Sequence, residues 1–290
     1  MTTTTPVTTA PPKQRRERSY LASVGLHTTL VLATIIALFP VLWVALSSFK
    51  PQWAIQRTTI KFIDHPTLDN YRHVLFDTSF PRWFLNSVVV AAFTMLIGIT
   101  MAATAGYALA RFNFAGKRTL MWTFLLTQMF PVAILIVPIY TIMANLNLID
   151  TKLSLIIAYC TVAVPFCAWM MKGYFETIPR ELDEAAALDG LGPFATFWRV
   201  ILPLARPGLA VTAFYTFLTA WGEVAYAMAF IQTDKNLTLG AGLQQFVPRF
   251  NPQWDLLTAS AIMVTIPAAI VFFFAQKHLV AGLTAGGTKG

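Results

Sequence analysis

Long apolar runs constrain this chain more than any other feature of its sequence. Each run is about 19 to 25 residues long, which at about 1.5 Å of helical rise per residue is enough to cross a hydrocarbon core of about 30 Å. The runs occupy residues 24–46, 86–109, 119–143, 153–171, 207–231 and 256–280. The sequence therefore predicts an all-α integral membrane protein with six transmembrane helices.

Nearly all of the charged residues lie in the segments between these runs. They make up only 12% of the chain, whereas a soluble protein carries about 25%. The net charge of +8 does not indicate a nucleic-acid partner. Its first cluster, Lys13 to Arg18, directly precedes an apolar run, as is typical of the cytoplasmic side of a membrane. The Thr- and Pro-rich start cannot build a core, so residues 1–19 are expected to form a disordered cytoplasmic tail.

The distribution of Lys and Arg between the loops predicts the orientation in the membrane. Loop 110–118 carries three basic residues, and the equally long loop 144–152 carries one. By the positive-inside rule, loop 110–118, loop 172–206 and both termini lie in the cytoplasm. The first outer loop, 47–85, holds five basic residues and fits less well. It is longer and also carries Asp residues, so it counts less toward the orientation.

Sequence motifs for catalysis or cofactor binding are absent. Gly116-Lys117 is followed by Arg118 and lacks the earlier glycine of a phosphate-binding loop. Cys160 and Cys167 have no His or acidic neighbour at ligand spacing and are interpreted as buried free thiols. We therefore predict no catalytic residue, no metal site and no cofactor bound by this chain, so energy for any pumping must come from a partner.

A polar segment at 172–206 interrupts the apolar pattern and is too charged to enter lipid. Thr177 is expected to cap a helix that begins near Pro179. Gly190 or Gly192 is expected to end this helix. Pro193 would start a second short helix, which Pro203 and Pro207 end before the fifth apolar run. The segment is predicted to form a helix–turn–helix along the cytoplasmic membrane surface.

The surface of this segment indicates a partner. Three alanines, 185–187, would let another protein approach closely, and Leu191, Phe194, Phe197 and Trp198 are expected to be exposed and to need a cover. The alternative interpretation is a solvated loop with helical propensity and no partner.

The same segment resembles a known motif. Glu184, Ala185, Ala186 and Gly190, followed by Val200-Ile201-Leu202-Pro203, are similar to the coupling loop of permease subunits in bacterial ATP-binding-cassette (ABC) importers. Val200 stands where isoleucine is usual. Residues 107–117, 242–245 and 280–290 further resemble the second permease subunit of maltose-type importers. The resemblance implies that residues 20–290 are a type I ABC importer transmembrane domain with a cytoplasmic coupling helix, in a bacterial cytoplasmic (inner) membrane.

The resemblance also implies partners. These are a second permease subunit, two copies of an ABC ATPase that binds ATP and Mg, and an extracytoplasmic sugar-binding protein. The chain would be the non-catalytic subunit, importing maltose or maltodextrin, with trehalose or another disaccharide as the alternative. Docking to the ATPase is implied for Glu184, Ala185, Ala186, Gly190 and Leu191. The C-terminal residues Gly287, Thr288, Lys289 and Gly290 are implied to contact the ATPase interface.

A sugar pathway needs aromatic and hydrogen-bonding groups within the bilayer. Glu223 is the only acidic residue in an apolar run, and an ionisable group there is a functional candidate. Trp221 and Tyr226 flank it, and Gln128 and Tyr140 are the polar candidates of the third run. The alternative is that Glu223 bonds to another helix or to interfacial water. In maltose-type importers the main sugar contacts belong to the other permease.

Two other classes of function fit the chain less well. A self-contained secondary transporter would show charge pairs or broken-helix ion sites within its spans, and this chain offers one isolated acid. An intramembrane enzyme would need paired acids, a Ser–His arrangement or metal ligands, and the sequence contains none of these in its apolar runs.

Overall fold

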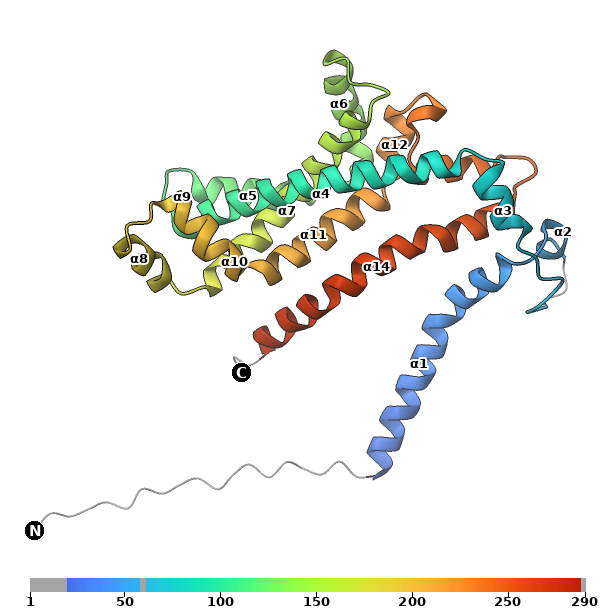
Figure 1. The fold of residues 1–290 in the computed structure, drawn as a ribbon, viewed down its shortest axis with the longest axis horizontal. Coiled ribbons are helices and arrows are strands. Elements are labelled where there is room, and N and C mark those ends of the chain that lie inside the picture. Colours follow the sequence, from blue (N-terminus) through green and yellow to red (C-terminus); the bar gives the residue numbers. More distant parts are fainter. Residues whose placement is uncertain (1–19, 58–60, 288–290) are drawn as a thin grey trace, which may run out of the picture. The chain divides into compact units, whose positions relative to one another are not determined.

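The computed structural model describes residues 20–57 and 61–287, and within these residues the regular elements are all helices, without any strand (Figure 1). The expected N-terminal tail, 1–19, lies outside them. The chain divides into two compact units, residues 1–44 and residues 45–290. Helix α1 (Tyr20–Ser47) begins in the first unit and ends just after the boundary with the second. Its apolar side chains occupy every face, as expected for a helix surrounded by lipid or by other apolar helices.

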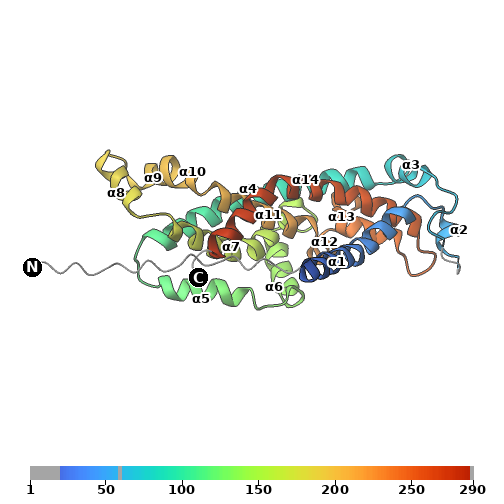
Figure 2. The same cartoon turned by 90° about the horizontal axis from the view of Figure 1, so that it is seen from below.

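The second unit is built around four long helices. These are α4 (Phe80–Arg111), α7 (Lys152–Thr177), α11 (Arg206–Trp221) and α14 (Trp254–Gly287). Helix α4 packs along α7, and α11 packs on α4, α7 and α14; Figures 1 and 2 show α4, α7 and α11 side by side. One large core cluster and a smaller one, around Tyr107 and Phe175, fill the space between these helices.

Small residues on α4 allow the close approach of α7 and α11. Gly98, Ala102 and Gly106 recur every fourth residue and are buried. A Cβ at Gly106 would lie 2.7 Å from the Met171 Cβ and 2.9 Å from the Lys172 backbone nitrogen. Such seams of small residues bring membrane helices into backbone contact.

This seam makes a testable prediction. Gly106→Ala is expected to destabilise the chain by about 1–3 kcal/mol, because its methyl group meets backbone atoms that cannot move independently. The matched control is Gly173→Ala in α7, where an added Cβ would meet nothing within 4 Å. There the helix gains roughly 0.5–1 kcal/mol from the better helix former. Thermal unfolding in detergent measures both; equal melting temperatures would contradict the assigned close approach.

Two of the expected spans are not continuous helices. Residues 119–143 form α5 (Lys117–Thr127) and α6 (Val132–Asn145), which meet at a bend of 109°. Pro131 sits at this break, and proline disfavours helical backbone in the residue before it. In the range 207–231, α11 ends at Trp221 and a separate helix, α12, spans Ala225–Phe230.

The number of spans depends on how bent pairs are counted. Within the described residues, four helices are long and apolar enough to cross a membrane. The number rises to six if each of two bent helix pairs is counted as one span. The second pair joins residues 193–204 to α11 at 81°. The expected span boundaries and the division into a tail and residues 20–290 remain predictions.

Short helices cover one end of the second unit. They are α2 (Gln52–Ile55), α3 (Asp69–Phe76), η2 (Asp234–Asn236), α13 (Leu239–Gly242) and η3 (Leu243–Phe246). Asp150 accepts hydrogen bonds from the backbone N–H groups of Gln232 and Thr233, both at 3.0 Å. Burial alone would raise the pKa of Asp150, but these hydrogen bonds hold it below its ordinary value. The segment after α12 is therefore fastened to the α6–α7 turn.

Candidate functional site

The polar segment 172–206 folds into a helical loop at the end of the second unit opposite α3 (Figure 1). After α7 come α8 (Glu181–Leu188), α9 (Pro193–Thr196), a π-helical turn η1 (Phe197–Ile201) and α10 (Leu202–Leu204). The predicted helix–turn–helix, with a second helix that starts at Pro193, is confirmed. We call residues 178–204 the α8–α10 loop.

Gly190 makes the turn between α8 and α9. Its φ of +82° lies in the left-handed region that favours glycine. The Gly190 N–H donates to the Ala187 carbonyl at 3.0 Å, and the Leu191 N–H donates to the Ala186 carbonyl at 2.9 Å. This pair of bonds is the Schellman motif, which satisfies the last free carbonyls of a helix. Of the two glycines considered, Gly190 rather than Gly192 ends α8.

The expected cap at Thr177 is wrong. Thr177 is the last residue of α7, and its hydroxyl donates to the Tyr174 carbonyl at 2.7 Å. The hydroxyl therefore bonds back into the helix that it ends. Arg180 occupies the cap position of α8 and makes no side-chain cap bond.

The docking residues implied by the resemblance do not all face outward. Glu184, Ala185 and Gly190 are exposed, Leu191 is half-buried, and Ala186 is buried at 4% exposure. The sequence missed Leu188, which is 90% exposed. Leu188 lies four residues after Glu184, so the two share a helix face; this spacing was the signal that could have identified it.

The expected set of exposed apolar side chains needs two corrections, the first being the half-buried Leu191. Phe194 and Trp198 are exposed, but Phe197 is buried at 4% exposure. Its ring lies 4.8 Å from the ring of Tyr107 and 6.3 Å from that of Phe175, measured between centroids. Phe197 therefore anchors the α8–α10 loop to α4 and α7 instead of offering a surface to a partner.

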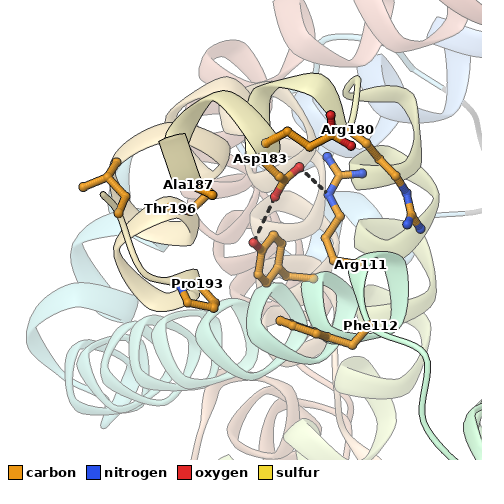
Figure 3. A pocket seen from close by; sticks show the side chains of 10 residues that line it. Arg111, Phe112, Arg180, Asp183, Ala187, Pro193 and Thr196 are labelled. Carbon is orange, nitrogen blue, oxygen red and sulfur yellow. Dashed lines mark hydrogen bonds and ion pairs between the residues drawn. The ribbon is translucent and has the colours of Figure 1, made fainter. Parts of the chain in front are cut away.

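A buried ion pair joins the α8–α10 loop to the end of α4 (Figure 3). Arg111 Nε lies 3.0 Å from Asp183 Oδ2, and the two side chains are 7% and 23% exposed. The Tyr107 hydroxyl donates to Asp183 Oδ1 at 3.1 Å. The sequence indicated no partner for Arg111 or Asp183, because the two residues are far apart in the chain.

Backbone carbonyls extend this connection. Arg111 Nη2 donates to the Ile178 carbonyl at 3.0 Å, and Arg180 Nη2 donates to the Ala110 carbonyl at 3.1 Å. The two arginines thus bond in opposite directions between α4 and the loop. A cavity of about 280 Å³ lies beside them, lined among others by Phe112, Glu184, Ala187, Leu191 and Pro193. The α8–α10 loop is therefore bonded to the end of α4 by one ion pair and by hydrogen bonds in both directions.

Of the residues predicted for a sugar pathway, three aromatic ones lie in the core and Gln128 lies outside it. Tyr140 and Tyr226 both contact the ring of Phe230, at 5.9 and 5.4 Å between centroids. Trp221 is buried and donates to the Val264 carbonyl at 3.2 Å. Gln128 is exposed at the bend after α5, where it donates to the Val162 carbonyl at 3.2 Å, and it is not among the residues of this core.

The Glu223 side chain hydrogen-bonds to the start of helix α12. Its carboxylate accepts hydrogen bonds from the Tyr226 and Ala227 N–H groups, at 2.9 and 3.3 Å. These are first-turn donors of α12, so Glu223 satisfies the start of that helix and lies near its positive dipole end. The structure therefore favours the alternative in which Glu223 bonds to a helix.

The remaining expectations concern the C-terminus and the thiols. Gly287 is the last residue of α14, and Thr288, Lys289 and Gly290 lie outside the described residues. Cys160 and Cys167 are buried free thiols, as predicted. In the part of the chain that the structure describes, no three His, Cys, Asp or Glu side chains are grouped to hold a metal ion.

Comparisons with known proteins give the family. Residues 95–285 match the model of the binding-protein-dependent transport system inner membrane component family. The chain is 36% identical over 266 residues to the maltodextrin transport system permease protein MdxG of Bacillus subtilis (strain 168), covering 90% of this chain and 94% of that one. It is 35% identical over 256 residues to the trehalose transport system permease protein SugB of Mycobacterium tuberculosis (strain CDC 1551 / Oshkosh), covering 88% and 93%.

A solved structure shows the same fold. It is a chain of a bacterial ABC transporter involved in the import of the acidic polysaccharide alginate, with a TM-score of 0.78 and 22% identity. The match covers 92% of this chain and 99% of that one. The predicted all-α type I importer fold is thereby confirmed. The family match over 95–285 and relatives aligned along most of their length show that this chain belongs to the binding-protein-dependent transport inner membrane components, as a multi-pass permease subunit of an ABC importer.

Proposed function

We propose that this chain is one of two permease subunits of an ATP-driven importer that takes up maltose- or maltodextrin-type oligosaccharides. The observation that carries the proposal is the α8–α10 loop, an exposed helix tied to α4 by the Arg111–Asp183 pair. The maltodextrin permease is the relative of higher identity in the pair reported above, which favours that substrate. Trehalose or another disaccharide is the second candidate, favoured by the trehalose permease at 35% identity.

The α8–α10 loop would dock on one copy of an ABC ATPase. Glu184, Ala185 and Gly190 offer a small-residue, acidic surface, to which we add the exposed Leu188 and Phe194. Contiguous exposed apolar side chains beside polar ones are typical of protein interaction sites. ATP and Mg would bind in the two ATPase copies, and this chain would bind neither.

The remaining partners follow from the same proposal. A second permease subunit would complete the pathway, and an extracytoplasmic binding protein would deliver sugar to the end that carries α2 and α3. Both termini would lie in the cytoplasm, with Gly287 to Gly290 directed to the ATPase dimer. Trp221, Tyr226 and Tyr140 are built into the core, so we assign them a role in shaping the pathway, and Glu223 the role of holding α12 beside it.

The test is the ATPase activity of the complex that copurifies with this chain. The activity is titrated with maltose, maltotriose and trehalose in the presence of the cognate binding protein. We expect hydrolysis to rise several-fold with maltodextrins and not with trehalose. Stimulation by trehalose alone would select the second candidate. A chain that purifies alone and without ATPase activity would contradict the importer proposal.

A further inference from the structure

A second cavity lies at the start of α5 and carries a concentration of positive charge. Its volume is about 590 Å³, and it is lined by Phe114, Gly116, Lys117, Arg118, Thr119, Met121, Trp122, Leu125 and Lys172. Three of these residues are cations, and no acidic residue is among them. The α8–α10 loop does not contribute to the lining, so this cavity is separate from the surface proposed for the ATPase.

The charges in this cavity are only partly neutralised. Lys172 Nζ lies 2.7 Å from Glu176 Oε1, and among the described residues this pair is the one acidic contact of the three cations. Lys117 Nζ donates to the Phe112 carbonyl at 3.1 Å, and no carboxylate in the described part of the chain forms an ion pair with it. Among the described residues, Arg118 has no ion pair or hydrogen bond through its exposed side chain.

The backbone adds to the positive potential. Helix α5 has eleven residues and begins at Lys117, with no acidic residue in its first turn and no side-chain cap. Acidic residues usually occupy this position because the free N–H groups there carry partial positive charge. Two cations in the first turn are therefore unfavourable for the helix alone and become favourable when an anion binds between them.

The lining changes from charged to apolar along α5, which indicates what kind of anion fits. Trp122 lies four residues beyond Arg118, or about 6 Å along the helix axis, and Leu125 about 4–5 Å further. Both side chains are open, at 56% and 36% exposure. A soluble anion would use only the cations, whereas the order cation, Trp and Leu follows the order of headgroup, interface and acyl chain in a lipid leaflet.

From this gradient we infer that the α5 cavity binds an anionic phospholipid of the membrane leaflet on the side of the α8–α10 loop. The lipid phosphate lies between Lys117 and Arg118, and its glycerol and acyl chain lie along Trp122 and Leu125. The site depends on the chain spanning a membrane, and it does not depend on which sugar is transported or on docking of the ATPase.

Trp122 provides a reporter inside the cavity. The full chain is reconstituted with its copurifying subunits into vesicles of phosphatidylcholine with a minority of phosphatidylglycerol. Two vesicle sets share this composition and differ only in which lipid carries bromine on its acyl chains. The signal of Trp122 is the fluorescence difference between the wild-type chain and Trp122→Phe. We expect brominated phosphatidylglycerol to quench this signal several-fold more, per mole, than brominated phosphatidylcholine.

Variants identify the cations as the cause. Lys117→Gln with Arg118→Gln is expected to abolish this several-fold preference for phosphatidylglycerol, because each cation near an anionic membrane surface contributes up to about fivefold in affinity. The charge-retaining pair Lys117→Arg with Arg118→Lys is expected to keep it. Lys277→Gln, an exposed cation of α14 outside the cavity lining, is the matched control and should leave the preference unchanged.

Three results would overturn the inference. The first is equal quenching by both lipids in the wild-type chain, or a preference that survives loss of both cations. The second is loss of the preference when inorganic phosphate is added, which would assign the cavity to a soluble anion. The third is a Trp122 signal that neither lipid quenches, which would mean that another subunit covers the cavity. Copurification of the ATPase with each variant reports separately on the proposed function.

Discussion

Glu184→Lys is expected to leave the chain folded in the membrane and to weaken its association with the ATPase strongly. Glu184 is exposed and has no ion pair among the described residues, so the free chain loses little. On docking, the reversed charge would be buried against a surface suited to a carboxylate, and losses of about 2–5 kcal/mol are typical. The ATPase should therefore bind at least about 30-fold more weakly. Copurification of the ATPase and sugar-stimulated hydrolysis measure the effect.

Gly190→Asp tests the same surface through the backbone. The residue has φ +82°, and an added Cβ would meet nothing within 4 Å. The substitution therefore acts through backbone strain of about 1–2 kcal/mol and through a charge placed on the docking face. Gly192→Asp is the matched control. Gly192 is exposed, has φ −72° and stands at the cap of α9, where aspartate is favoured.

Two controls separate docking from folding. Asp77→Lys makes the same charge change as Glu184→Lys on an exposed residue at the other end of the second unit, and it should leave ATPase binding unchanged. Normal ATPase association and sugar uptake in both Glu184→Lys and Gly190→Asp would refute docking through α8.

Asp183→Asn is expected to separate the α8–α10 loop from α4. It leaves the Arg111 guanidinium, 7% exposed, without its counter-charge. Removing one partner of a buried ion pair costs about 3–5 kcal/mol of stability. Asp183 is 23% exposed, so the expected cost lies at the lower end of this range. Hydrogen exchange of the amides in 178–191 should rise by about two orders of magnitude, and ATP hydrolysis should lose its coupling to sugar.

The pair can be tested by a double-mutant cycle. Arg111→Gln with Asp183→Asn removes both charges, so it should be less damaging than the sum of the single changes. Glu176→Gln breaks the more exposed pair with Lys172 and should change stability by no more than about 1 kcal/mol. Additive effects of the two single changes would mean that the Arg111–Asp183 contact does not couple the loop to α4.

The local structure of the α8–α10 loop was largely predictable from its sequence. Glycine is the residue that adopts the left-handed backbone of a helix end, so Gly190 was a correct candidate for the turn. Proline suits a first helical turn, so Pro193 marked the second helix. The predicted cap at Thr177 was wrong because its hydroxyl can either cap α8 or bond back within α7. Which of the two bonds forms depends on the residue at which α7 ends.

The broken spans were harder to predict. Pro131, Pro138 and Pro165 all lie in apolar runs, yet α6 and α7 continue through Pro138 and Pro165. Whether proline breaks or only kinks a membrane helix depends on neighbours that re-satisfy the freed backbone groups. Glu223 illustrates the same limit, since a lone acid in an apolar run was consistent with a ligand until its bonds to the start of α12 were known.

The sequence by itself determined the class of this protein: apolar runs of spanning length demand helices, and the spacing of Glu184, Ala185, Ala186 and Gly190 singled out the segment that resembles a coupling loop. These features depend on neighbours within a few residues, where periodicity and backbone preference act. The tertiary structure alone decided that Ala186 and Phe197 face inward, that Arg111 pairs with Asp183, and that Lys117 and Arg118 line the α5 cavity. Those outcomes depend on contacts between distant segments, and no local preference encodes which side chain a distant helix will meet.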